Sequence, residues 1–225
     1  MGNELKYTGP GARIFVRVFV AIWICLIMVV GCQSINPLPK FGVGDASPEE
    51  VKIRKLMEWH SGRVEVYRDF RTVFTARAVY LSSDIQKLAA DWEARSKMMN
   101  PEERAKFEER FLGEGKPLIK VLVGFYTPKE EQNDLSGENS SWITYLKHPD
   151  GTVTRAACLD VDKESTRIYM RFLKWDLSWS KLYLLCFPYS PGLDSQDQEF
   201  VSMIISGAQG SGEIHLQISP PADQP

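Results

Sequence analysis

The acidic residues whose spacing suits metal chemistry lie close together in the sequence. Asp160, Asp162 and Glu164 alternate at the expected end of a strand, which places their carboxylates on one face. Carboxylate oxygens are the ligands that Ca²⁺ prefers. The segment lacks the glycine and the further acids of an EF-hand loop, so a polar strand end is the simpler interpretation. These three residues are the candidates for a metal site, and no cofactor is expected.

Residues for nucleophilic or acid–base catalysis form no recognisable set. The three histidines, His60, His148 and His215, lie far apart in the sequence, and each is expected at the surface. The chain has no G-x-S-x-G turn, no phosphate-binding glycine loop and no dinucleotide fingerprint. A cell-wall or glycan hydrolase with two carboxylates is the alternative, although the sequence does not identify the pair. We therefore expect a protein that is not an enzyme.

The N-terminal segment combines a basic flank with an apolar run. Lys6, Arg13 and Arg17 precede fourteen uncharged residues, 18–31, nearly all of them large and apolar. A secretory signal needs about 7–15 apolar residues after a positive region, whereas a helix that spans a bilayer needs about 20. The length favours a signal segment. A membrane-spanning helix that starts near Ile14 is the alternative.

The end of this run, Val29-Val30-Gly31-Cys32, resembles the lipobox of bacterial lipoproteins. The resemblance covers residues 1–32. It implies cleavage after residue 31 and lipidation of Cys32 with diacylglycerol and an acyl chain such as palmitate, which is more than stable attachment to membrane lipid requires. It also implies a protein of the cell envelope that faces the periplasm. Because Gln33 rather than Asp follows the cysteine, the outer membrane is favoured over the inner membrane.

The cysteines divide between the signal segment and the rest of the chain. Cys25 would be removed with the signal, which leaves Cys158 and Cys186 beside the lipidated Cys32. Cys158 and Cys186 lie 28 residues apart on strand-like segments, with no histidine nearby that would suggest zinc. In an oxidising compartment they would form a disulfide. Two buried thiols are the alternative.

Charge and composition limit the domain organisation and the partners. Without residues 1–31, the chain has 24 basic and 28 acidic residues, a net charge of −4 that argues against a nucleic-acid partner. Residues 32–46 are rich in proline and glycine and are typical of a tether. Residues 47–219 are expected to form one domain, and residues 220–225 a flexible tail.

Three segments have the signatures of helices. Ser47-Pro48-Glu49-Glu50 and Asn100-Pro101-Glu102-Glu103 both combine a capping residue with proline and acids in the first turn. The second of these helices would dock through Phe107 and Phe111. Between them, residues 83–99 carry an apolar stripe, with Glu93 expected on the solvent side.

The other segments alternate with the period of strands. Strands are expected over 63–81 with a bend at 69–71, and over 119–125, 142–146, 152–161, 167–173, 181–187, 200–206 and 213–218. Segment 181–187 is nearly all apolar and is expected to be central, and 207–212 is expected to be a glycine-rich turn. The fold class is α+β, mainly β: an antiparallel β-sandwich with an α-helical insertion near 83–112, preceded by the signal or anchor helix.

The segment Lys174–Lys181 carries the aromatic residues Trp175 and Trp179 between two expected strands. If exposed, they would form a partner surface; packing in the core is the alternative. The sequence thus predicts a membrane-anchored envelope lipoprotein that binds an envelope protein or glycan through this segment or through a sheet edge. A sugar- or Ca²⁺-binding module is the third hypothesis.

Overall fold

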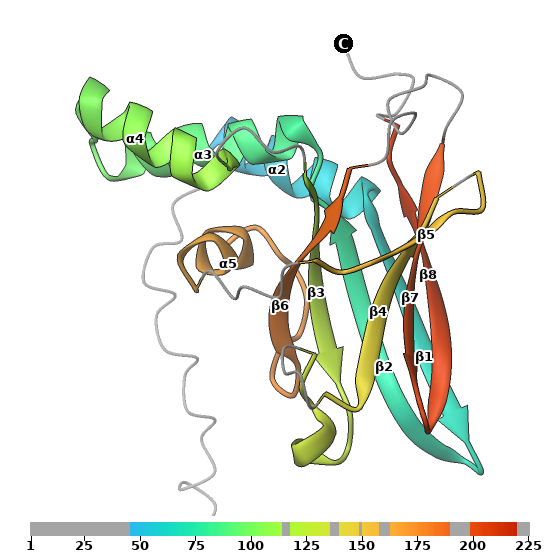
Figure 1. The fold of residues 1–225 in the computed structure, drawn as a ribbon. Coiled ribbons are helices and arrows are strands. Elements are labelled where there is room, and N and C mark those ends of the chain that lie inside the picture. Colours follow the sequence, from blue (N-terminus) through green and yellow to red (C-terminus); the bar gives the residue numbers. More distant parts are fainter. Residues whose placement is uncertain are drawn as a thin grey trace, which may run out of the picture. The chain divides into compact units, whose positions relative to one another are not determined.

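The computed structural model describes residues 46–113, 118–135, 140–148, 150–157, 163–189 and 199–219. The predicted signal segment, Cys32 and the tether lie outside these residues. Residues 46–225 form one compact unit (Figure 1). Within the described residues, no helix has both the length and the apolar character needed to cross a bilayer.

The described residues form two antiparallel sheets of four strands each, which confirms the expected mainly-β, α+β fold class. The first sheet has the order β1-β2-β3-β6, with β1 Ser61–Arg68, β2 Arg71–Tyr80, β3 Leu118–Tyr126 and β6 Lys181–Pro188. The second has the order β5-β4-β7-β8, with β4 Trp142–Lys147, β5 Val153–Arg155, β7 Phe200–Gly207 and β8 Gly210–Gln217.

Four helices cover the outer face of the first sheet. They are α2 Pro48–Trp59, α3 Ser83–Ser96, α4 Pro101–Leu112 and α5 Lys163–Met170. Their apolar side chains pack on Val79, Leu122 and Leu184 of the sheet. The expected helical insertion at 83–112 is therefore part of a larger helical layer, to which segments before β1 and before β6 also contribute (Figure 1).

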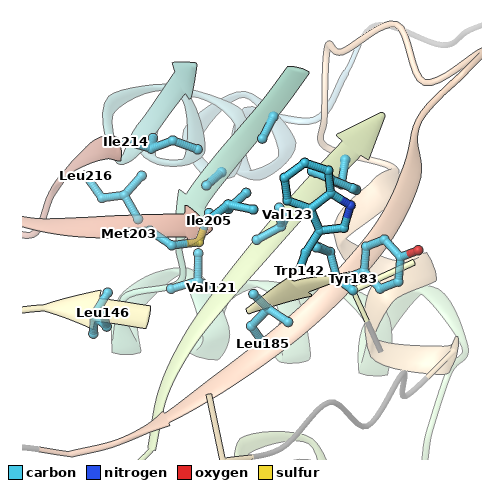
Figure 2. Packing of buried hydrophobic residues seen from close by; sticks show 14 of the residues in the cluster. Val121, Val123, Trp142, Leu146, Tyr183, Leu185, Met203, Ile205, Ile214 and Leu216 are labelled. Atoms are coloured by element: carbon cyan, nitrogen blue, oxygen red, sulfur yellow. The ribbon is translucent and has the colours of Figure 1, made fainter. Parts of the chain in front are cut away.

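A second core fills the space between the two sheets. On β3, Ile119, Val121, Val123 and Phe125 face this core, because alternate residues of a strand point to the same side. Figure 2 shows Val121 and Val123 among side chains from both sheets. Trp142 and Tyr183 donate their ring N–H and hydroxyl to the carbonyls of Gln132 and Asn133, at 2.8 and 3.0 Å, and so tie the 3-10 turn η1 Glu130–Gln132 to the core.

The two predicted helix starts have the geometry that their sequences indicate. The Ser47 hydroxyl accepts from the Glu50 amide at 3.2 Å, and the Glu50 carboxylate accepts from the Ser47 amide at 3.2 Å. Asn100 and Glu103 form the same reciprocal pair at 2.9 and 3.0 Å. These bonds satisfy amides that have no partner inside the helix. Phe107 and Phe111 are buried as expected.

Two strand predictions were wrong. The structure has helix α5 where the sequence predicts a strand over 167–173, because Ile168, Tyr169 and Phe172 form a helical stripe on the first sheet. Segment 181–187 is an edge strand, not a central one. It is apolar because its two faces pack into the two different cores, Leu185 toward the other sheet and Leu184 toward the helices.

The expected hairpin near the C-terminus is present with longer strands than predicted. Gly207 pairs with Gly210, so residues 208 and 209 make the turn. The other hairpin partner, predicted over 152–161, contributes the three residues of β5, and residues 158–161 lie outside the described part.

The edge strands β1 and β8 of the two sheets approach each other closely. A Cβ atom at Gly62 of β1 would lie 2.5 Å from the carbonyl oxygen of His215 on β8. Only glycine permits this approach without movement of the backbone. The sandwich is thus closed along the β1–β8 side.

Candidate functional site

The segment between α5 and β6 crosses the outer face of the first sheet in an ordered turn. Asp176 accepts hydrogen bonds from the amide and the hydroxyl of Ser178, at 3.0 and 2.6 Å. The bond from the Ser178 hydroxyl has the larger effect, and both bonds lower the pKa of Asp176. The charge of Arg77 lowers this pKa further. The Ser180 amide donates to the Leu177 carbonyl at 3.2 Å. The turn therefore fixes how Trp175 is presented.

The Trp175 ring lies against Gly124 of β3. A Cβ atom at Gly124 would be 3.3 Å from the indole, so the absent side chain lets the ring pack on the strand. Trp175 is partly buried, whereas Trp179 is 79% exposed. The two predicted partner residues thus differ: Trp175 shapes the surface, and Trp179 projects from it.

Two hollows flank Trp175, with volumes of about 240 and 140 Å³, and both are lined by Arg77 and Trp175. Arg54 and Lys174 line the larger hollow, and Arg63 lines the smaller one. We call the two hollows, with these five residues, the Trp175 groove.

The sheet register places basic residues side by side in the groove. Arg63 of β1 lies directly opposite Arg77 of β2, and Arg77 lies opposite Gly124 of β3. Like charges in directly opposite positions destabilise an antiparallel pair. Arg63 is paired with Glu65 along its own strand, whereas Arg77 has no carboxylate of the described residues within 4.0 Å and interacts only over a longer distance with Asp176 and Glu65.

The charges of the groove are only partly neutralised. Lys174 lies 3.6 Å from Glu58, and both side chains are exposed. Among the described residues, no carboxylate lies within 4.0 Å of the guanidinium groups of Arg54 or Arg77. Guanidinium groups bind carboxylates and phosphates through two parallel hydrogen bonds. The groove therefore offers an anion two such groups beside an indole ring.

Of the predicted metal candidates, Glu164 lies within the described residues. Glu164 lies 3.1 Å from Lys97 and 2.8 Å from Arg110, so its charge links helices α3, α4 and α5. Asp160 and Asp162 lie outside the described residues. Among those that are described, no group of three or more potential ligands occurs.

The cysteines are described in part. Cys186 of β6 is buried and disulfide-bonded, whereas Cys158 lies outside the described residues. The amide of the preceding residue, Ala157, donates to the Cys186 carbonyl at 2.8 Å. The pairing of Cys158 with Cys186 stays a prediction, and this contact supports it.

The surface prediction for the histidines was wrong for two of the three. His60 and His148 are buried, and burial is the main cause that lowers the pKa of each. The His60 Nδ1–H donates to the Gln217 carbonyl at 2.5 Å, and His148 Nε2 lies 3.1 Å from the Thr154 hydroxyl. His215 is exposed as expected.

His215 also has a serine neighbour. Its Nδ1 lies 2.9 Å from the hydroxyl of Ser202, which is buried in the middle of β7. In a G-x-S-x-G nucleophile elbow the serine lies on a sharp turn between a strand and a helix, and Ser202 is not on one. The Ser202–His215 contact joins directly opposite positions of β7 and β8.

Sequence reasoning missed one buried carboxylate. Glu93, expected on the solvent side of α3, is 2% exposed and lies 2.9 Å from Lys97 and 3.5 Å from Arg171. Helix α5 covers it, and because α5 was predicted as a strand, its contact with α3 was not foreseen.

Comparison with known proteins adds little to this geometry. No protein-family model matches the chain, and no curated protein matches it. A solved structure of a novel protein of unknown function from Burkholderia pseudomallei is similar over 73% of this chain and 82% of its own, with 10% identity and a TM-score of 0.43. Similarity at this level carries no inference about function.

Proposed function

We propose that this chain is a cell-envelope lipoprotein, anchored to membrane lipid through Cys32, that binds an anionic envelope component without catalysis. The lipobox motif supports the anchor. The Trp175 groove supports the binding role, because Arg54 and Arg77 lie beside an indole and no carboxylate of the described residues lies within 4.0 Å of either guanidinium group.

The groove supports a binding site better than the sheet edges do. Edges β1 and β8 lie against each other at Gly62. The edge of β6 is bridged by the hydrogen bond from Ala157 to Cys186, and β5 has three residues. Addition of a partner's strand needs a row of unpaired backbone N–H and C=O groups. These edges have few such groups to offer.

The described residues give no support to the hydrolase alternative. Glycoside hydrolysis needs two carboxylates about 5–10 Å apart across a cleft. The buried carboxylate of the described part, Glu93, is paired with Lys97 and Arg171 on the helical side. The groove itself contains Glu58, Glu65 and Asp176, each bonded to a neighbouring side chain.

The binding role can be tested with purified peptidoglycan, an envelope polymer that has sugar rings and free carboxylates. The double variant Arg54→Gln and Arg77→Gln should reduce cosedimentation about tenfold or more, since each charged hydrogen-bond donor contributes about 1.5–3 kcal/mol. Lys106→Gln is the matched control, because Lys106 is exposed and already paired with Glu102 at 2.7 Å. Equal cosedimentation of all three proteins would refute the groove as the site for this polymer.

The anchor is tested separately by the intact mass of the protein from bacterial membranes. We expect a species that begins at Cys32 with added acyl mass, and the loss of that species in Cys32→Ala. An unprocessed chain of 225 residues in both samples would disprove lipidation in that host, and the membrane-spanning alternative would then apply.

A further inference from the structure

The turn between β1 and β2 exposes the apolar side chain of Phe70 and holds its backbone in an unfavourable conformation. Asp69 and Phe70 have φ angles of 50° and 61°. Hairpin turns of this kind favour Asn-Gly, because residues other than Gly, Asn and Asp are strained at positive φ. Phe70 is nevertheless there, and it is fully exposed at 106% of its reference area. Neither its conformation nor its exposure benefits the folded unit.

The turn borders a cationic hollow of about 890 Å³. Its lining includes Arg68, Arg71 and Lys129, and the acid in the lining is Asp69, 4.0 Å from Arg68. Glu130 and Glu131 follow Lys129 in the sequence but do not line the hollow. The hollow therefore has two positive charges in excess. The Gln209 side-chain amide in its lining donates to the Gln132 side-chain oxygen at 2.8 Å.

We propose that this tip, residues 68–71 with the adjoining hollow, docks on an anionic membrane surface. Phe70 would enter the interface between headgroups and acyl chains, and the cations would bind lipid phosphates. An exposed aromatic ring flanked by arginines is suited to this boundary, because the ring is apolar and basic residues are attracted to anionic lipids. The proposal does not depend on lipidation of Cys32 or on the Trp175 groove.

The geometry favours a membrane over a protein partner. A stable protein interface buries about 800 Å² on each side, and a four-residue turn with one apolar side chain offers much less. One exposed aromatic ring and two excess positive charges are enough for a weak, reversible membrane contact. The turn lies at the end of β1 remote from α2 (Figure 1), so the helices do not obstruct its approach.

The test uses the unit of residues 46–225, which is compact and contains both hydrophobic cores. Cosedimentation is measured with vesicles of phosphatidylglycerol and phosphatidylcholine in equal parts, and with phosphatidylcholine alone. We expect binding to the anionic vesicles. Phe70→Asn should weaken it about tenfold or more, from the lost apolar burial, and Arg71→Gln about fivefold.

Phe70→Asn should not impair folding, because asparagine tolerates positive φ better than phenylalanine. The matched control is Met98→Asn, since Met98 is also apolar, 91% exposed and at a φ of 51°. This control should bind like the parent. If the folded unit binds neither kind of vesicle, or if both Asn variants bind like the parent, the membrane proposal is wrong and a protein partner becomes the explanation for the exposed ring.

Discussion

On helices α3 and α4 each arginine lies against a carboxylate, whereas in the Trp175 groove two arginines have none among the described residues. Arg95 contacts Glu49 and Asp91 at 2.6 Å each, and Arg104 contacts Asp91 and Glu108 at 2.5 and 2.6 Å. Arg54 and Arg77 have no such contact, although α2 and β2 place them on the same side of the first sheet. The arginines of α3 and α4 are thus paired with carboxylates, whereas Arg54 and Arg77 of the groove are not.

This difference distinguishes arginines that are paired within the protein from arginines that can bind a ligand. Exposed ion pairs contribute about 0–1 kcal/mol each, so the pairs on the helices hold their neighbours in place without a large gain in stability. A guanidinium group that has no carboxylate partner keeps its N–H donors available to a ligand. The charged run of α4 is thus a solvated face, and the groove is the better place to look for a partner.

The largest expected effect comes from the disulfide, which would enclose both α5 and the groove segment. We predict that Cys158 pairs with Cys186 and that replacing both by serine lowers the free energy of unfolding by about 3.6 kcal/mol, the chain-entropy value for a loop of this length. Urea denaturation measures the change, and digestion without reductant should yield one peptide that contains both cysteines. Two separate peptides, or equal stability, would contradict the pairing.

A smaller effect is expected at Glu93, where the helical layer buries its charge. Glu93→Gln removes the carboxylate from between Lys97 and Arg171, which are both half-exposed and can be rehydrated. We therefore expect a loss of about 1–2 kcal/mol, less than for fully buried cations. Glu102→Gln, which breaks the exposed pair with Lys106, should cost less than about 0.5 kcal/mol. Similar losses in the two variants would show that burial is not what gives Glu93 its importance.

The smallest expected effect is a pH dependence at His60, which immediately precedes Ser61 at the edge of the groove. Burial lowers the pKa of His60 below 6.5, so below this pH the unfolded chain binds more protons than the folded one. Stability should therefore be retained above pH 6.5 and lost progressively as the pH falls toward the folded-state pKa. His60→Asn keeps a donor to the Gln217 carbonyl without the titration, and should show a flatter dependence of Tm on pH. Parallel curves for the two proteins would exclude this role.

Local signals were enough to predict much of the fold. The capping residues Ser47 and Asn100 with their acids fixed two helix starts, and the alternation from Ile119 to Phe125 predicted β3. The helix α5 was missed because a short apolar run is compatible with a strand or with a buried helix. Without α5, the burial of Glu93 could not be inferred.

The site depended on contacts that no local pattern contains. The sequence drew attention to Trp175 and Trp179, but not to Arg54 and Arg77, which the sheet register and the position of α2 bring to the indole. The bend at 69–71 was expected, while the exposure of Phe70 follows from the absence of any described neighbour that covers it. His60 is buried because Tyr80 and the last strand pack around it.

The close approach of β1 and β8 at Gly62 has a consequence for behaviour at high concentration. At high concentration, open sheet edges can pair with copies of the same chain and start extended aggregates. Here the edge strands β1 and β8 lie against each other at Gly62. The edge of β6 accepts a hydrogen bond from Ala157 at Cys186, and the edge strand β5 has three residues. The described sheet edges therefore offer little free backbone for pairing between copies of this chain.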